Sequence, residues 1–235
     1  MDSLDKILSF RPDGKLEKVC LAGFPNLLHE WNLAVDLGGK FFRPAGWDEC
    51  FPTIEPYQGS PVMGELIGLS PEIYWQADSV EQLWHTTSSE ARRRFSLETG
   101  SCLVMSFQVT NQLGAPLEFL WASHALFSVA SLAQVRLSDG SILSEFDNDG
   151  SEAKFFCANT KPIELVTPRN RAILTTDQPW WGIWLNRGGW PVGSPHPMCC
   201  LGLEATNTPS EYPNGQWLDA GAVFSGKVRI EIVSS

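Results

Sequence analysis

The chain has 235 residues, which is enough to bury one sizeable core, and a β-sandwich of this length commonly forms a single domain. Charged residues make up only 19%, alongside 10 Trp and 13 Phe, so the composition excludes a disordered or coiled-coil chain. The formal net charge of -10 argues against nucleic acid and anionic membrane surfaces as partners, because an acidic surface repels phosphate groups.

Helical patterns are short and confined to residues 3–10 and 79–84. Residues 38–68, which lie between them, are rich in Pro, Gly and aromatic side chains, as is typical of an ordered functional loop. Apolar and polar residues then alternate along 103–110 and again along 227–232, as they do in half-buried strands.

Dipeptides that end in glycine separate the strand-like segments. Asp139-Gly140, Asp149-Gly150 and Asn214-Gly215 combine residues that tolerate the positive φ of tight hairpin turns. Short strands at this spacing predict antiparallel sheets, and the sheets must cover each other because no helical layer is available. We therefore predict an all-β antiparallel sandwich with little helix, as one domain over residues 1–235.

The sequence lacks the usual signals of metal and cofactor sites. Its four histidines are scattered, with no H-x-H or H-E-x-x-H spacing, and its six cysteines form no C-x-x-C pair. G-x-S-x-G, G-x-G-x-x-G and phosphate-binding loop patterns are also missing. We therefore expect no metal, no cofactor and reduced thiols.

The N-terminal sequence gives no sign of export. Residues 1–10 carry two Asp and no basic segment, and no stretch of the chain approaches the roughly 18 apolar residues that a membrane span needs. We expect a soluble, cytoplasmic protein.

Four segments collect aromatic, acidic and histidine residues. They are GWDECFPTI at 46–54, FLWASH at 119–124, WWGIWLNRGG at 180–189 and GLEATN at 202–207. Together they resemble the aldose 1-epimerase (galactose mutarotase) family, in which a loop like the first precedes a His-Gly-Glu motif, a strand ends in Trp-Ala-x-His and a late Gly-Leu-Glu supplies a carboxylate. Their order and approximate spacing match from about Trp31 to the C-terminus. The resemblance implies a galactose-mutarotase-like sandwich that binds a carbohydrate.

The resemblance also implies a reaction. Opening a cyclic hemiacetal needs a base at the anomeric hydroxyl and an acid at the ring oxygen, after which rotation and reclosure give the other anomer. By the family pattern Glu204 matches the base and His124 matches the acid. Two structural alternatives stay open, namely a Glu204 carboxylate hydrogen-bonded to a loop and a satisfied His124 at a strand end.

Other residues of these segments are expected to bind the substrate, with tryptophans offering flat apolar faces to sugar C–H groups. At least one of Trp180, Trp181 and Trp184 is expected in the core, because they fall on both faces of one strand. The expected substrate-binding residues are Trp47, Asp48, Glu49, Met63, Glu65, Trp121, Trp184, Asn186 and Arg187.

Two features depart from the family pattern. Met63 stands where the family's His-Gly-Glu motif has histidine, and methionine cannot donate a proton. Residues 1–30 form an atypical N-terminal segment, in which we expect the strands that start the family's sandwich to be shortened or absent. A partner subunit, as in a homodimer, is one replacement for them.

Three functional hypotheses follow. The first is an isomerase that interconverts the anomers of an aldose or modified sugar. The second is a sugar-binding module that has lost turnover, which the methionine at position 63 favours. The third is a repurposed isomerase or cyclase that acts on a less polar small molecule in the same groove.

Overall fold

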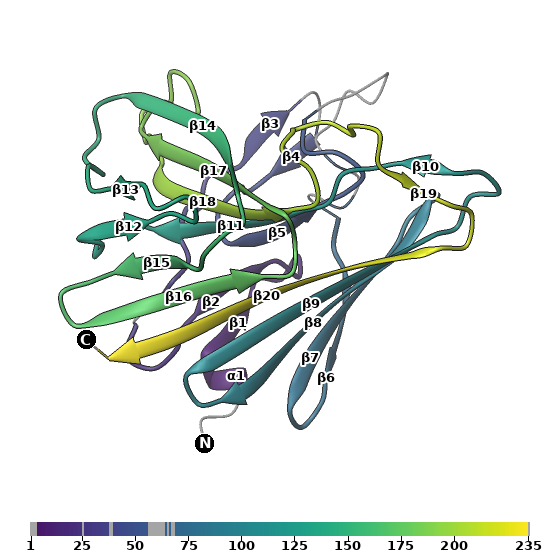
Figure 1. Ribbon diagram of the computed structural model, residues 1–235, viewed down its shortest axis with the longest axis horizontal. Coiled ribbons are helices and arrows are strands. Elements are labelled where there is room, and N and C mark those ends of the chain that lie inside the picture. The colour runs from purple at the N-terminus through teal and green to yellow at the C-terminus, as the bar shows by residue number, and fades with distance from the viewer. Residues whose placement is uncertain are drawn as a thin grey trace.

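The computed structural model describes residues 4–24, 26–37, 40–55, 64, 66 and 69–234, which form two large antiparallel sheets in two layers (Figure 1). The seven-stranded sheet has the order β1 (Leu8–Phe10), β2 (Leu16–Val19), β5 (Trp47–Cys50), β11 (Ala122–Ser128), β18 (Cys199–Thr206), β17 (Trp180–Arg187) and β14 (Ser151–Ala158). The nine-stranded sheet has the order β13 (Ile142–Leu143), β12 (Gln134–Arg136), β15 (Ile163–Val166), β16 (Asn170–Thr176), β20 (Val223–Ser234), β9 (Cys102–Asn111), β8 (Ser89–Thr99), β7 (Ser79–His85) and β6 (Glu72–Trp75).

The remaining elements are small. Two ribbons pair β3 (Val35–Leu37) with β4 (Lys40–Phe42) and β10 (Leu117–Glu118) with β19 (Trp217–Leu218), and helix within the described residues is limited to α1 (Leu4–Ile7). The predicted antiparallel all-β architecture with little helix is therefore confirmed. No helix in the described part of the chain is long and apolar enough to cross a membrane.

The strand predictions for 103–110 and 227–232 are confirmed by β9 and β20. The helix predicted at 79–84 is wrong, because these residues form β7 and pair along their whole length with β8. Val80 and Trp84 are buried with the intervening side chain of Gln82, which is the two-residue period of a strand. Cross-strand pairing and burial thus override the local helical pattern.

Each central strand of the seven-stranded sheet sends alternate side chains to opposite faces. The inner face packs against the nine-stranded sheet and carries the largest buried rings, including Trp47, Trp121 and Trp181. Trp121 stacks on Phe107 with ring centroids 5.3 Å apart, and a Cβ at Gly226 would come within 2.5 Å of its ring. Gly226 on β20 therefore makes room for the Trp121 indole between the two sheets.

Candidate active site

The candidate active site is a row of side chains on the outer face of the seven-stranded sheet. Strand register places His124 on β11 opposite Asp48 on β5, and on its other side opposite Glu204 on β18. Glu204 is in turn opposite Gly182 on β17. Residues that are directly opposite on neighbouring strands share a face, so the three titratable side chains lie next to one another.

His124 and Glu204 form a buried pair. His124 Nε2 lies 3.5 Å from Glu204 Oε1, and the exposed fractions of the two residues are 8% and 0%. Neither carboxylate oxygen of Glu204, nor Nδ1 of His124, has a hydrogen-bond partner within the described residues. Buried polar groups are nearly always satisfied, so three atoms without a partner among the described residues mark the pair as a candidate ligand site.

Two glycines make room for this carboxylate. A Cβ at Gly182 would come within 3.3 Å of Glu204 Oε2, and a Cβ at Gly202 would lie 3.5 Å from Oε1. Contacts of 3.3 Å are tighter than ordinary van der Waals packing, so a side chain at Gly182 would crowd the carboxylate. Gly202 and Gly182 therefore let the neighbouring strands and the side chains of Phe156, Trp184 and Leu126 pack closely around the acid.

Burial favours the neutral form of His124. Burial lowers the pKa of His124 below its ordinary 6.5, while the negative charges of Glu204 and Asp48 oppose that effect. A neutral imidazole carries one N–H donor and one acceptor nitrogen, so it can donate one hydrogen bond, and its acceptor nitrogen can take up a proton that the resulting imidazolium can give back.

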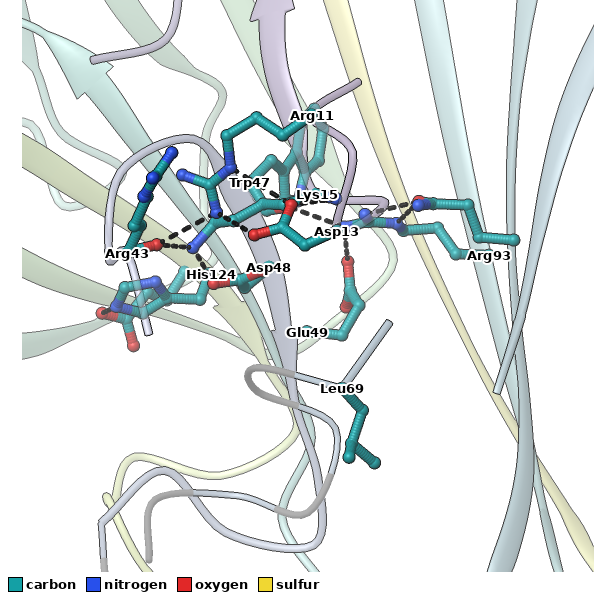
Figure 2. Close-up of polar contacts among 12 residues, drawn as sticks. Arg11, Asp13, Lys15, Arg43, Trp47, Asp48, Glu49, Leu69, Arg93 and His124 are labelled. Carbon is teal, nitrogen blue, oxygen red and sulfur yellow. Dashed lines mark hydrogen bonds and ion pairs between the residues drawn. The ribbon is translucent and has the colours of Figure 1, made fainter. Parts of the chain in front are cut away.

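The edge of the row is completed by the N-terminal segment, as Figure 2 shows. Buried Lys15 forms an ion pair with Asp48 and donates a hydrogen bond of 2.7 Å to the carbonyl of Arg43. Burial lowers the pKa of Lys15, and the Asp48 charge opposes the decrease. A cavity of about 140 Å³ lies beside this ion pair, and its polar lining includes Arg11, Asp13, Lys15, Arg43 and Asp48.

A chain of tryptophans borders the other side of the pair. The ring of Trp184 lies 6.4 Å from that of His124, Trp190 lies 5.7 Å from Trp184, and Trp31 lies 6.4 Å from Trp190. All three tryptophans are partly buried and pack against a small apolar cluster on the outer face. They give the site the flat apolar surface that pyranose rings favour.

A wider cavity, of about 840 Å³, lies at the far end of β11 and includes Ser128, His29 and Glu30 in its lining. Its carboxylate at Glu30 already accepts a hydrogen bond from Asn26 and pairs with Lys18.

Solved structures share this arrangement of strands over nearly the whole chain. A protein from Escherichia coli K12, described as a candidate aldose 1-epimerase, has a TM-score of 0.68 at 14% identity, covering 95% of this chain and 94% of that one. A protein from Synechocystis sp. PCC 6803 has a TM-score of 0.67 at 14% identity, covering 97% and 92%. The galactose 1-epimerase from Lactobacillus acidophilus NCFM has a TM-score of 0.64 at 14% identity, covering 95% and 89%. The chain has the galactose-mutarotase-like fold.

This likeness confirms the resemblance drawn from the four sequence segments, at the level of the fold. No protein-family model matches the sequence, and a search of curated proteins finds no match.

Two tryptophans expected to line the groove have a different place in the galactose-mutarotase-like fold. Trp47 and Trp121 are 1% and 0% exposed and belong to the core between the sheets. Successive residues of a strand point to opposite faces of the sheet. Asp48 occupies the outer face, so Trp47 before it points into the core. A core role thus replaces the groove role expected for both rings.

Glu49 likewise faces inward, where its carboxylate joins the two sheets. It pairs with Arg93 at 3.1 Å and accepts hydrogen bonds from Trp121 Nε1 at 2.8 Å and Ser123 Oγ at 3.2 Å. Burial raises the pKa of Glu49 to about 7, against the opposing charge of Arg93. With these partners in place, the Glu49 carboxylate joins the two sheets, and the residue also lines the cavity beside the Lys15–Asp48 ion pair.

Asn186 and Arg187 have structural partners at the far end of β17. Buried Asn186 donates to the carbonyl of Trp190 at 2.8 Å and so braces the loop that carries the tryptophan. Arg187 pairs with Asp149 at 3.0 Å and donates to Ser151 Oγ at 2.9 Å. Both residues therefore shape the site from outside it.

Of the remaining expected residues, Asp48 and Trp184 lie beside the pair, whereas Met63 and Glu65 fall outside the described residues. Sequence reasoning missed Lys15, Trp190 and Lys154. Lys154 lies on β14, where burial lowers its pKa and the charge of Glu204 raises it. The tryptophan-rich composition was the one available signal for Trp190, and nothing in the sequence linked Lys15 to Asp48.

Proposed function

We propose that the protein is an isomerase of the aldose 1-epimerase type, which interconverts the anomers of an aldose or modified sugar. The observation that carries the proposal is the buried His124–Glu204 pair, in which His124 Nε2 lies 3.5 Å from Glu204 Oε1 and three polar atoms have no hydrogen-bond partner within the described part of the chain. The anomeric hydroxyl and the ring oxygen are bonded to the same carbon, so the acid and the base that act on them must be neighbours.

In this mechanism Glu204 accepts the proton of the anomeric hydroxyl while His124 donates a proton to the ring oxygen. The bond between the anomeric carbon and the ring oxygen breaks, and an open-chain aldehyde forms. Rotation about the adjacent carbon–carbon bond presents the other face of the carbonyl, and the two proton transfers then run in reverse. His124 donates this proton as an imidazolium, whose acidity its lowered pKa increases, and the neutral imidazole that remains takes the proton back when the ring closes.

Side chains around the pair are suited to hold the sugar. Trp184 offers an apolar face next to His124, and the Asp48–Lys15 ion pair offers an acceptor and a donor for hydroxyl groups at the opposite edge. Met63 and Glu65 remain proposed substrate ligands on the strength of the sequence resemblance. The expected cytoplasmic location is supported by the buried thiols of Cys50, Cys102, Cys157 and Cys200, which form no disulfide and suit a reducing compartment.

The direct test is anomer exchange. Freshly dissolved α-anomers of several aldoses would be followed by polarimetry with and without the protein, and we expect accelerated equilibration for at least one sugar. A rate equal to that of buffer for all the sugars would contradict the proposal.

The second candidate function is a sugar-binding module without turnover, favoured by the methionine at position 63 where the family has histidine. A melting temperature that rises with added sugar, together with an unchanged rate of anomer exchange, would support this alternative. A protein that binds apolar ligands in preference to sugars would instead support the repurposed isomerase.

A further inference from the structure

The row of side chains at the candidate active site has a fixed order across the sheet. His124 on β11 lies between Glu204 on β18 and Asp48 on β5, because strand register pairs it with both. Lys15 comes directly before β2 and meets Asp48 from the side of β5 that faces away from β11 (Figure 2). The order along the row is therefore proposed base, proposed acid and ion pair, with neighbouring strands about 4.8 Å apart.

A pyranose carries its groups in a matching order. The ring oxygen is bonded to the anomeric carbon on one side, and on the other side to the carbon that bears the exocyclic hydroxymethyl group of a hexose. In the proposed mechanism Glu204 acts at the anomeric hydroxyl and His124 acts at the ring oxygen. The hydroxymethyl group then lies on the side of His124 that faces away from Glu204, which is the side of Asp48 and Lys15.

The ion pair offers the two contacts that one hydroxyl can make. A hydroxyl group both donates and accepts hydrogen bonds, so it can donate to the Asp48 carboxylate and accept from the Lys15 ammonium group. Both side chains are largely buried, with exposed fractions of 13% and 7%, and the Arg43 carbonyl also holds Lys15 Nζ at 2.7 Å. Hydrogen bonds to charged groups are stronger than those between neutral groups, so this hydroxyl would be recognised through two strong bonds.

The cavity beside the ion pair favours a neutral group over an anionic one. Its volume of about 140 Å³ is several times the space that one water molecule takes in the liquid. Arg11 pairs with Asp13 at 3.2 Å and Arg93 pairs with Glu49 at 3.1 Å, so these charges of the lining are already compensated. Arg43 also lines the cavity but is exposed, so water solvates its charge. A hydroxyl needs no further counter-charge here, whereas a phosphate or carboxylate would face the carboxylates of the lining.

We propose that Lys15 and Asp48 are specificity-determining residues, which bind the exocyclic hydroxyl of a hexose and so select hexoses over pentoses and over deoxy sugars with a methyl group at that position. This inference rests on the proposed function, because the roles of Glu204 and His124 set the direction of the sugar along the row. The N-terminal segment, which departs from the family pattern, thereby completes the substrate site.

Two series of sugars test this selection in the unmodified protein. D-Galactose, D-fucose and L-arabinose share one ring configuration and carry hydroxymethyl, methyl and hydrogen at the relevant carbon, and D-glucose, D-quinovose and D-xylose form the same series for a second configuration. NMR would measure anomer exchange for each sugar. In the series that the protein accepts, we expect kcat/KM to be about tenfold to a hundredfold higher for the hexose, because the other two sugars leave both charged groups without their hydroxyl.

Two outcomes of this comparison would overturn the inference. Equal kcat/KM values within the accepted series would remove the selection for the exocyclic hydroxyl. A higher kcat/KM for the hexose that carries a phosphate ester on that hydroxyl than for the free hexose would overturn the neutral occupant.

Double variants test the two residues. Lys15→Met combined with Asp48→Leu removes both charges together, so neither is left buried without its partner. The control combines Lys18→Met with Glu30→Leu, which removes an ion pair of the same N-terminal segment whose side chains are 41% and 47% exposed. We expect the preference for the hexose over its deoxy analogue to fall to about threefold or less in the first protein and to keep its wild-type value in the control. A folded Lys15→Met, Asp48→Leu protein with the wild-type preference would overturn the assignment.

Asp48→Asn is the milder variant, because it keeps the shape of the side chain. An amide oxygen accepts a weaker hydrogen bond than a carboxylate does, so we expect the preference to fall by a few fold. An unchanged preference would overturn the role given to Asp48.

Binding separates this inference from the proposed function. Calorimetry of the wild type with a hexose and its deoxy analogue reports the contact to the hydroxyl without turnover, and we expect the hexose to bind about tenfold more tightly. The absence of anomer exchange for every sugar would contradict the proposed function alone, whereas equal affinities would overturn the specificity given to Lys15 and Asp48.

Discussion

Glu49 and Glu204 are both buried carboxylates of the seven-stranded sheet, with exposed fractions of 2% and 0%, but they lie on opposite faces. Glu49 accepts hydrogen bonds from Arg93, Trp121 and Ser123 and joins the two sheets. Glu204 accepts none from the described residues. Because an unsatisfied buried carboxylate costs free energy that a fully bonded one does not, the comparison assigns a stabilising role to Glu49 and supports the proposed ligand role of Glu204.

The largest expected effect is on turnover. Glu204→Gln keeps the shape of the side chain but removes the proton acceptor, so we expect kcat for anomer exchange to fall by about two to four orders of magnitude. The melting temperature should change little, because the variant loses no hydrogen bond within the described residues. Polarimetry and thermal unfolding would measure the two effects, with exposed Glu145→Gln as the control. Wild-type turnover in Glu204→Gln would remove the base from the mechanism.

The free energy of unfolding should depend more on Glu49 than on Glu204. Glu49→Ala leaves the Arg93 guanidinium buried without its counter-charge, which typically costs about 3–5 kcal/mol in the free energy of unfolding. Glu204→Ala should cost about 1 kcal/mol or less, since it removes a carboxylate that has no hydrogen-bonded partner among the described residues. Urea unfolding of both variants at one pH would measure the difference. If the two variants lost equal stability, the distinction between the two carboxylates would fail.

The pH dependence of stability tests the neutral state of His124. Burial lowers its pKa from 6.5, so the unfolded chain binds the proton at a higher pH than the folded protein does. The free energy of unfolding should therefore fall as the pH drops below about 6.5 and through the folded pKa. His124→Asn should show a weaker decline in the same range. Parallel stability curves for the two proteins would show that His124 does not contribute this proton.

The smallest expected effect concerns the aromatic border. Trp184→Ala removes the apolar face beside His124, and we expect sugar binding to weaken by a few fold, equivalent to about 0.5–1.5 kcal/mol. Calorimetry with the sugar that shows turnover would measure it. Trp75→Ala is a suitable control, because Trp75 is 48% exposed on the edge strand β6 of the other sheet. Equal weakening by both substitutions would mean that Trp184 has no special place at the site.

The fold could be predicted from the sequence because the alternating segments and glycine turns mark antiparallel strands. β9 and β20 lie where the alternation placed them, while β7 was misread because its short apolar pattern fits either period. Figure 1 shows why β7 is a strand, since it lies within the layer formed by β6 and β8.

The site could be predicted only in part. His124 and Glu204 come from segments 80 residues apart, yet register makes them neighbours, as the family resemblance implied. The inward rings of Trp47 and Trp121 could have been inferred from parity, because His124 lies three residues after Trp121 and so points to the other face. The Lys15–Asp48 pair could not, since 33 residues separate its members and no local pattern connects them.

The central claim is that a sugar's anomeric centre binds between His124 and Glu204, and a crystal structure of the protein soaked with the most active sugar tests it most directly. We predict that the anomeric hydroxyl lies within hydrogen-bond distance of Glu204, with the ring oxygen near His124 and the pyranose against Trp184. A sugar found only in the cavity around Ser128, with the His124–Glu204 pair untouched, would contradict the account.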